Sequence, residues 1–112
     1  MKIRRVSDFS LYLIDHSQTL YECLVKFEEN KCHTLLIQKD KKIIGTVTDG
    51  DIRKALIKFR TLQTKVNLVM NTNYISCHSK SGCEDFFQKY PYLTLLPVIN
   101  DERELLSIFL RF

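Results

Sequence analysis

The chain of 112 residues has no tryptophan, only three glycines, only two prolines and no long apolar run. So little glycine and proline excludes a collagen-like or linker-rich chain, while a hydrophobic share of 45% predicts a folded domain with a core. No apolar stretch approaches the roughly 18 to 20 residues that a membrane-spanning helix needs. We therefore expect a cytoplasmic protein with no membrane partner.

Acidic residues are absent from position 52 to position 83, where six lysines and arginines fall. The net charge of +4 is too small by itself to indicate a nucleic-acid partner, and we expect none. We interpret this acid-free stretch as a solvated face followed by a linker. An anion-attracting surface is the alternative.

The four cysteines, at positions 23, 32, 77 and 83, match neither zinc-binding CxxC pairs nor a dense secreted framework. Cys23 and Cys83 fall on apolar helical faces, so buried free thiols are expected. The neighbours Cys32 and His33 would point to opposite faces of an extended strand, as would the Cys-His pair at 77–78. We therefore predict no catalytic residue, no metal site, no cofactor and no enzymatic activity of this chain itself.

The sequence contains an internal repeat with a period near 62 residues. In each half an apolar stripe at spacing i, i+3, i+4, i+7 follows a hydroxyl residue and a glutamate in capping-box spacing, Thr19 with Glu22 and Ser81 with Glu84. The stripes are Leu20, Cys23, Leu24 and Phe27 in the first half, and Cys83, Phe86, Phe87 and Tyr90 in the second. Two helices in equivalent positions are predicted.

Two short apolar runs with a charged break follow each predicted helix, which is typical of a strand hairpin. The runs cover residues 35–37 and 43–47 in the first half, and 95–99 and 105–110 in the second. A further extended segment precedes each helix, near 11–14 and near 74–76. An apolar stripe over 52–59 predicts one more helix after the first hairpin, which completes a β-α-β-β-α unit.

The predicted fold class is α+β, with two such repeats packed sheet against sheet around a pseudo-two-fold axis. We place the first repeat at 1–59, a connecting segment at 60–72, and the second repeat at 73–112. We expect the second repeat to be incomplete, because the chain ends where its closing helix would begin. The apolar content of 60–72 argues against a free linker, and the interface between the halves is a natural place for a cleft.

The junction of strand and helix carries the pattern Gly45-x-x-Thr48-x-x-Asp51. A small residue inside a strand permits a close approach of backbone or ligand. Thr48 could donate to a phosphate at the helix start, and Asp51 could accept both hydroxyls of a ribose. Alternatively, Thr48 or Asp49 is a plain N-cap, and Asp51 is a favourable charge at a helix N-terminus.

The duplicated unit and this pattern together resemble the cystathionine β-synthase (CBS) domain, over about residues 6–57 and 66–112. The family occurs in tandem as a regulatory module for adenosine-containing ligands. The resemblance implies AMP, ADP or ATP as ligand, with Thr48 on phosphate and Asp51 on ribose. It also implies a homodimer of CBS pairs.

In the family the partner repeat completes the pocket, which by position implies walls near Tyr74, Ile75 and Ser76 and near Thr94, Leu95 and Leu96. Many nucleotide-binding members have basic residues where this chain has Thr94 and Leu95. This difference indicates weaker affinity for multiply charged phosphates, unless Arg53 or Lys54 compensates.

The second copy departs from the pattern, because Ser107 takes the place of Gly45 and Leu110 that of Thr48. At most one nucleotide site per chain is expected. His33 should lie near the second, degenerate cleft.

Residues 48–53 read Thr-Asp-Gly-Asp-Ile-Arg, which looks like the module attached to bacterial sugar nucleotidyltransferases and arabinose-5-phosphate isomerases. Because Met1 lies directly before the first repeat, we expect a C-terminal catalytic domain of the mannose-1-phosphate guanylyltransferase type. The alternatives are the CBS pair of such an isomerase, or a ligand-free module that only dimerises its parent enzyme.

Overall fold

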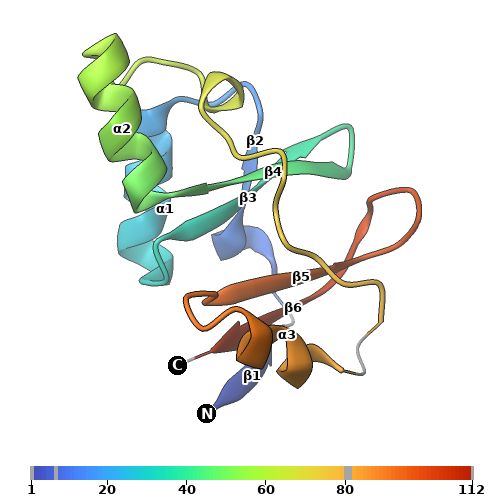
Figure 1. Ribbon diagram of the computed structural model, residues 1–112. Coiled ribbons are helices and arrows are strands. Elements are labelled where there is room, and N and C mark those ends of the chain that lie inside the picture. The colour runs from blue at the N-terminus through green and yellow to red at the C-terminus, as the bar shows by residue number, and fades with distance from the viewer. Residues whose placement is uncertain (1, 7, 80–81, 112) are drawn as a thin grey trace.

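The computed structural model describes residues 2–6, 8–79 and 82–111 as two three-stranded sheets with helices outside them (Figure 1). The first sheet has the order β2 (Leu13–Asp15), β3 (Thr34–Lys39), β4 (Lys42–Thr48). The second has the order β1 (Ile3–Val6), β6 (Leu105–Arg111), β5 (Leu95–Ile99). The predicted α+β fold of two packed sheets is confirmed.

Helices α1 (Leu20–Asn30) and α2 (Asp49–Phe59) pack on the first sheet, and α3 (Cys83–Lys89) packs on the second. Short 3-10 helices lie at Ser10–Tyr12 and Val66–Leu68. Among the residues described, no helix is long and apolar enough to cross a membrane.

Alternation along the strands separates three layers of core. Leu35 and Ile37 of β3 pack with α1 and α2, whereas Leu36 between them packs with the other sheet. A third cluster joins Phe87 of α3 to the outer face of the second sheet. The middle layer contains Tyr12, Leu36, Ile43, Leu95, Ile99, Ile108 and Leu110.

The two predicted capping boxes have different outcomes. At α1 the box is confirmed: the Glu22 N–H donates to Thr19 Oγ1 at 3.3 Å, and the Thr19 N–H donates to Glu22 Oε1 at 3.1 Å. Helix α3 begins at Cys83 after Gly82, whose φ is 80° and which makes no side-chain cap. Ser81, the predicted cap, lies outside the described residues.

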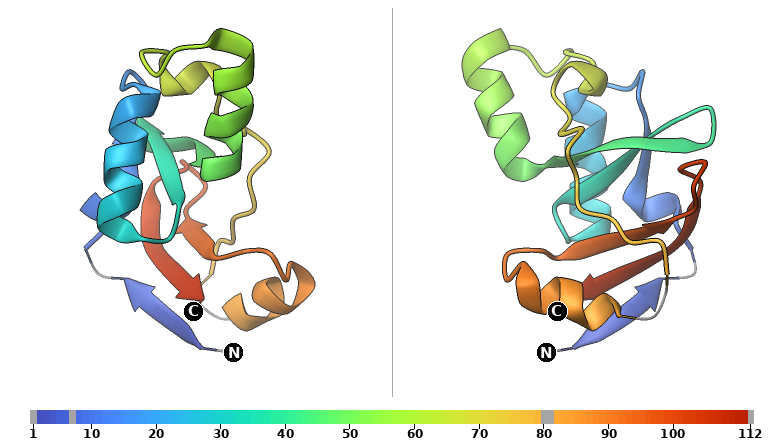
Figure 2. Two further views of the ribbon diagram at one scale, coloured as in Figure 1. Left: turned by 90° about the vertical axis from the view of Figure 1, so that its left-hand side faces the viewer. Right: turned by 45° about the vertical axis from the view of Figure 1, so that its right-hand side comes forward.

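Strand β1 is not predicted from the sequence, yet it completes the second sheet by pairing antiparallel with β6, Ile3 opposite Arg111. Both views of Figure 2 show β1 beside β6, although the two strands lie at opposite ends of the chain. The first sheet has a reduced counterpart, an antiparallel bridge between Asn71 and Thr46 of β4. Strand β1 is therefore an edge strand of the second sheet, whereas the first sheet gains a single bridge from the connecting segment at 60–72.

The two predicted extended segments before the helices are only partly correct. A 3-10 helix occupies Ser10–Tyr12, and strand β2 starts at Leu13. Residues 74–76 form no strand, and the pairing there is one parallel bridge between Cys77 and Val98.

The connecting segment at 60–72 is packed, as predicted. Val66 is fully buried and its N–H donates to the Gln18 carbonyl at 2.8 Å. The Leu20 N–H donates to the Thr64 carbonyl at 3.0 Å, which ties the segment to the start of α1.

Candidate functional site

Gly45 lies where the chain after α2 crosses strand β4. A Cβ atom at this position would lie 2.8 Å from Met70 Sδ and 3.1 Å from the Asn71 carbonyl oxygen. The neighbouring Thr46 exchanges two backbone hydrogen bonds with Asn71, at 3.0 and 2.8 Å. A side chain at Gly45 would therefore separate two segments that line the same cavity.

The junction of β4 and α2 forms a second capping box. The Thr48 N–H donates to Asp51 Oδ2 at 2.9 Å, and the Asp51 N–H donates to Thr48 Oγ1 at 3.3 Å. Asp49 accepts from Arg53 Nη1 at 2.9 Å, in an exposed ion pair. The plain N-cap that we gave as an alternative is thus the arrangement present, and it holds the Asp51 carboxylate against the backbone of Thr48.

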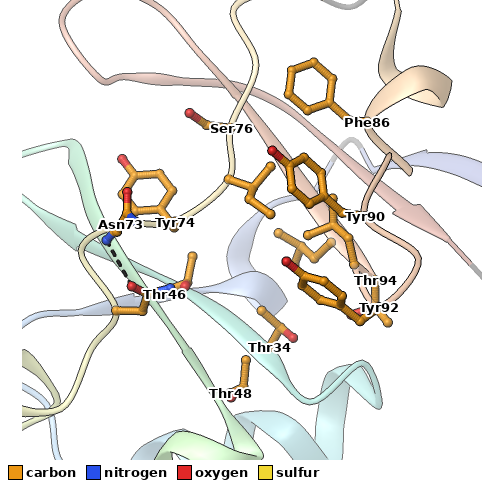
Figure 3. Close-up of a pocket in the computed structure, with 14 residues that line it drawn as sticks. Thr34, Thr46, Thr48, Asn73, Tyr74, Ser76, Phe86, Tyr90, Tyr92 and Thr94 are labelled. Carbon is orange, nitrogen blue, oxygen red and sulfur yellow. Dashed lines mark hydrogen bonds between the residues drawn. The ribbon is translucent and has the colours of Figure 1, made fainter. Parts of the chain in front are cut away.

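A cavity of about 570 Å³ lies between the two halves (Figure 3). Five of the six predicted site residues line it, and they come from both halves as expected: Thr48, Tyr74, Ile75, Thr94 and Leu95. The sixth, Asp51, lines instead a shallow groove beside α2, because its carboxylate is turned toward the helix cap. Its predicted contact with a ribose remains a prediction.

The polar lining of the first cavity comes largely from hydroxyls set by strand register. Thr46 and Thr48 are two residues apart on β4 and share one face, and Thr34 of β3 is the register partner of Thr48. Figure 3 shows Thr34, Thr46 and Thr48 along one side of the cavity. The sequence analysis missed Thr34 and Thr46. The alternation Thr-x-Thr at 46–48 was a signal for Thr46, whereas Thr34 follows only from the pairing of β3 with β4.

Aromatic rings form the opposite wall. Phe86, Tyr90 and Tyr92 come from α3 and the turn after it, whereas Tyr74 of the extended segment lies beside Thr46 on the other side (Figure 3). The rings of Tyr90 and Tyr92 meet nearly edge to face, with centroids 6.2 Å apart. The stripe of α3 thus contributes to the cavity as well as to the core.

Tyr74 is anchored on the threonine side of the cavity. Its hydroxyl donates to the Ile43 carbonyl at 2.9 Å, which ties the extended segment to strand β4. Burial raises the pKa of this phenol, so the hydroxyl stays protonated and remains a donor at neutral pH.

The first cavity has an uncharged lining. No Lys, Arg, His, Asp or Glu occurs among the lining residues that the structure describes. Arg53 and Lys54, the predicted compensating cations, are exposed on α2 and do not line it. The cations of the acid-free stretch therefore lie elsewhere, apart from Lys80, which is not among the described residues.

A second cavity, of about 390 Å³, lies on the other side of the interface and has a different chemistry. His33 lines it as predicted, together with the cationic side chains of Arg4, Lys31 and Arg111. Leu110, at the position equivalent to Thr48, also lines it. Lys31 and His33 both have a φ of 58°, a region that glycine and asparagine favour.

The cysteines are free thiols. Cys23 is buried, as predicted, but Cys83 is only half-buried. Burial raises the pKa of Cys23 to about 12, and it raises the pKa of Cys32 and Cys77 as well. No group of three or more potential metal ligands gathers anywhere in the described part of the chain.

Comparison with known proteins identifies the class. Residues 6–58 match the family model of the CBS domain. The two related sheets give the chain as a whole the fold of a tandem CBS pair. No curated protein sequence matches the chain.

Solved structures share this fold over most of the chain. A CBS domain protein from Streptococcus pneumoniae has a TM-score of 0.74 at 15% identity, covering 91% of this chain and 71% of its own. CbpB from Streptococcus agalactiae has a TM-score of 0.72 at 19% identity, covering 91% of this chain and 68% of its own. A structure of CbpB in complex with c-di-AMP has a TM-score of 0.71 at 20% identity, covering 88% and 70%.

Proposed function

We propose that the chain is a regulatory ligand-sensing module whose first cavity binds an adenosine-containing ligand. The observation that carries this proposal is the cavity itself, which lies between the part of the chain that matches the CBS domain, 6–58, and the second half and contains five of the six predicted residues. Its 570 Å³ falls within the range of small-molecule sites. The similar fold of CbpB, solved with c-di-AMP, supports an adenosine ligand.

Because residues of both halves line the cavity, a ligand would contact both at once. Thr48 and Thr94 come from different halves, as do Thr34 and Tyr74. A ligand shifts the relative arrangement of the halves only by as much as its affinity for the two arrangements differs. The CbpB complex and the sequence resemblance suggest AMP, ADP, ATP or a related adenosine compound as the class to test.

The test is a thermal-shift titration of the chain with adenosine compounds, because a ligand that binds only the folded state raises Tm. Asp51→Asn should weaken binding if its carboxylate turns to the ribose when ligand enters. Glu22→Gln alters the equivalent position of the α1 capping box and serves as the matched control. No Tm shift with any adenosine compound would exclude the proposed function.

A second candidate, an association module without ligand, is favoured by exposed apolar side chains on the helices. Tyr21 and Val25 of α1 are 55% and 44% exposed, and Ile57 of α2 is 81% exposed. A homodimer of CBS pairs joined through these helices would cover them. Light scattering of the wild type and of Ile57→Glu tests it: a monomer in both would contradict it.

We further propose that the module controls an attached sugar-phosphate nucleotidyltransferase of the mannose-1-phosphate guanylyltransferase type. The sequence Thr-Asp-Gly-Asp-Ile-Arg at 48–53 supports a nucleotidyltransferase as the parent enzyme, and an arabinose-5-phosphate isomerase is the alternative. Assays of both activities on the full polypeptide, with and without adenosine compounds, distinguish the two parents.

A further inference from the structure

The chemistry of the first cavity specifies its ligand more narrowly than the fold does. Every Lys, Arg and His among the described residues lies outside its lining. A phosphate group in proteins is usually held by Arg or Lys, or by free N–H groups at a helix start. Because the described lining has no Arg or Lys, a phosphate here would depend on the N–H groups of a helix start.

The start of helix α2 is the element of this fold that could hold a phosphate beside Thr48. Two of the N–H groups in its first turn are already used, since the Asp49 N–H donates to the His33 carbonyl at 3.2 Å and the Asp51 N–H donates to Thr48 Oγ1. Asp49 and Asp51 also place two carboxylates in the first turn, where they offset the positive end of the helix dipole. A phosphate here would meet two carboxylates, and the N–H groups of Asp49 and Asp51 would not be free to bind it.

The remaining lining suits an uncharged, flat and hydroxylated ligand. Phe86, Tyr90 and Tyr92 offer rings on which a base can stack. Thr34 and Thr46 on the opposite side offer hydroxyls that can both donate and accept, as hydrogen bonds to a ribose or a base edge require.

We infer that the first cavity binds phosphate-free adenosine in preference to AMP, ADP and ATP. The inference rests on the proposed function. It predicts that phosphate groups weaken binding, whereas the resemblance to the CBS family implies AMP, ADP or ATP as the ligand. Each added phosphate brings charge to a site where no cation lies among the described lining residues to balance it. Affinity should therefore fall from adenosine to AMP, and fall further to ADP and ATP.

The experiment is calorimetric titration of the wild-type chain with adenosine, AMP, ADP and ATP at one ionic strength. We expect AMP to bind at least about tenfold more weakly than adenosine, the ratio that one unpaired charge would produce. ATP or ADP binding as tightly as adenosine would overturn the inference and leave the proposed function intact. No binding of any of the four would overturn the proposed function itself.

Thr94→Arg provides a gain-of-charge variant, because Thr94 is exposed at the rim of the cavity and an arginine there can reach solvent. It should narrow the ratio of adenosine affinity to AMP affinity several-fold, and this ratio, not the affinity for adenosine itself, is the readout. Gln63→Arg adds the same charge at an exposed position outside the lining and should leave the ratio unchanged. An unchanged ratio in Thr94→Arg would refute charge as the cause of the selectivity.

Discussion

The two halves of the molecule share a pattern but not the devices that hold their helices. Helices α1 and α2 of the first half have 11 residues each, and each begins with a reciprocal capping box. Helix α3 of the second half has seven residues and begins after Gly82 without a side-chain cap. The two halves therefore share an apolar stripe, whereas the polar groups at the starts of their helices differ.

The two cavities likewise lie at equivalent places in the repeat but differ in the chemistry of their lining. The first is uncharged and rich in hydroxyls and aromatic rings, and the second is lined by Arg4, Lys31, His33 and Arg111. Thr94 lines both. Equivalent positions in a repeat thus predict where a cavity lies, but its ligand chemistry depends on individual side chains.

Deleting residues 1–6 should have the largest effect of the changes considered, a loss of stability in the second sheet but not in the first. The deletion removes β1 and leaves β6 as an unpaired edge, so that the second sheet keeps only two strands. Hydrogen exchange should show loss of protection in β5 and β6, with β3 and β4 still protected. Arg5→Ala, which leaves the backbone pairing in place, is the control, and equal loss in both sheets would contradict the prediction.

Exchanging the residues at the equivalent positions 45 and 107 should have the next largest effect, a change in the free energy of unfolding. Gly45 lies opposite Ile37, and Ser107 lies opposite Val98 in the other sheet. Gly45→Ser places a side chain against Met70 and should lower the free energy of unfolding by about 1–3 kcal/mol.

The reverse change, Ser107→Gly, should cost only about 0.5–1 kcal/mol through backbone entropy. Urea unfolding of both variants gives the two values. If Gly45→Ser were as mild as Ser107→Gly, the close approach of the segment at 70–71 would not be the reason for the glycine.

Some features of the molecule could be predicted from the sequence, and others could not. The repeat and the sheets followed from periodicity, because apolar spacing determines which face of each element is buried. The predicted cavity walls, in contrast, were implied by the resemblance to the CBS domain. Strand β1 was missed, since Ile-Arg-Arg-Val shows no alternation and its pairing partner lies more than a hundred residues away. The position of Asp51 could not be derived, because a capping residue and a ligand-binding residue have the same spacing.

Removing the caps should have a smaller effect, confined to the first half. Thr19→Ala and Thr48→Ala each lose a capping hydrogen bond, and each should lower the free energy of unfolding by about 1 kcal/mol. Glu84→Gln in the first turn of α3 should change it by less than about 0.5 kcal/mol. Thermal unfolding of the three variants measures this, and a Glu84→Gln effect as large as the other two would indicate that α3 is held as α1 is.

Thiol labelling compares the two halves in the wild-type chain, without any substitution, and should show the smallest effect. Burial raises the pKa of Cys23 to about 12, so its thiolate, the reactive form, is scarce in the folded state. Cys83 on α3 is only half-buried and should react first with a thiol reagent near neutral pH. Unfolded Cys23 ionises near its ordinary value of 9.0, so alkaline pH above that value should destabilise the fold and expose Cys23. Mass spectrometry of labelled peptides orders the sites, and equally fast labelling of Cys23 would show that the first half opens as readily as the second.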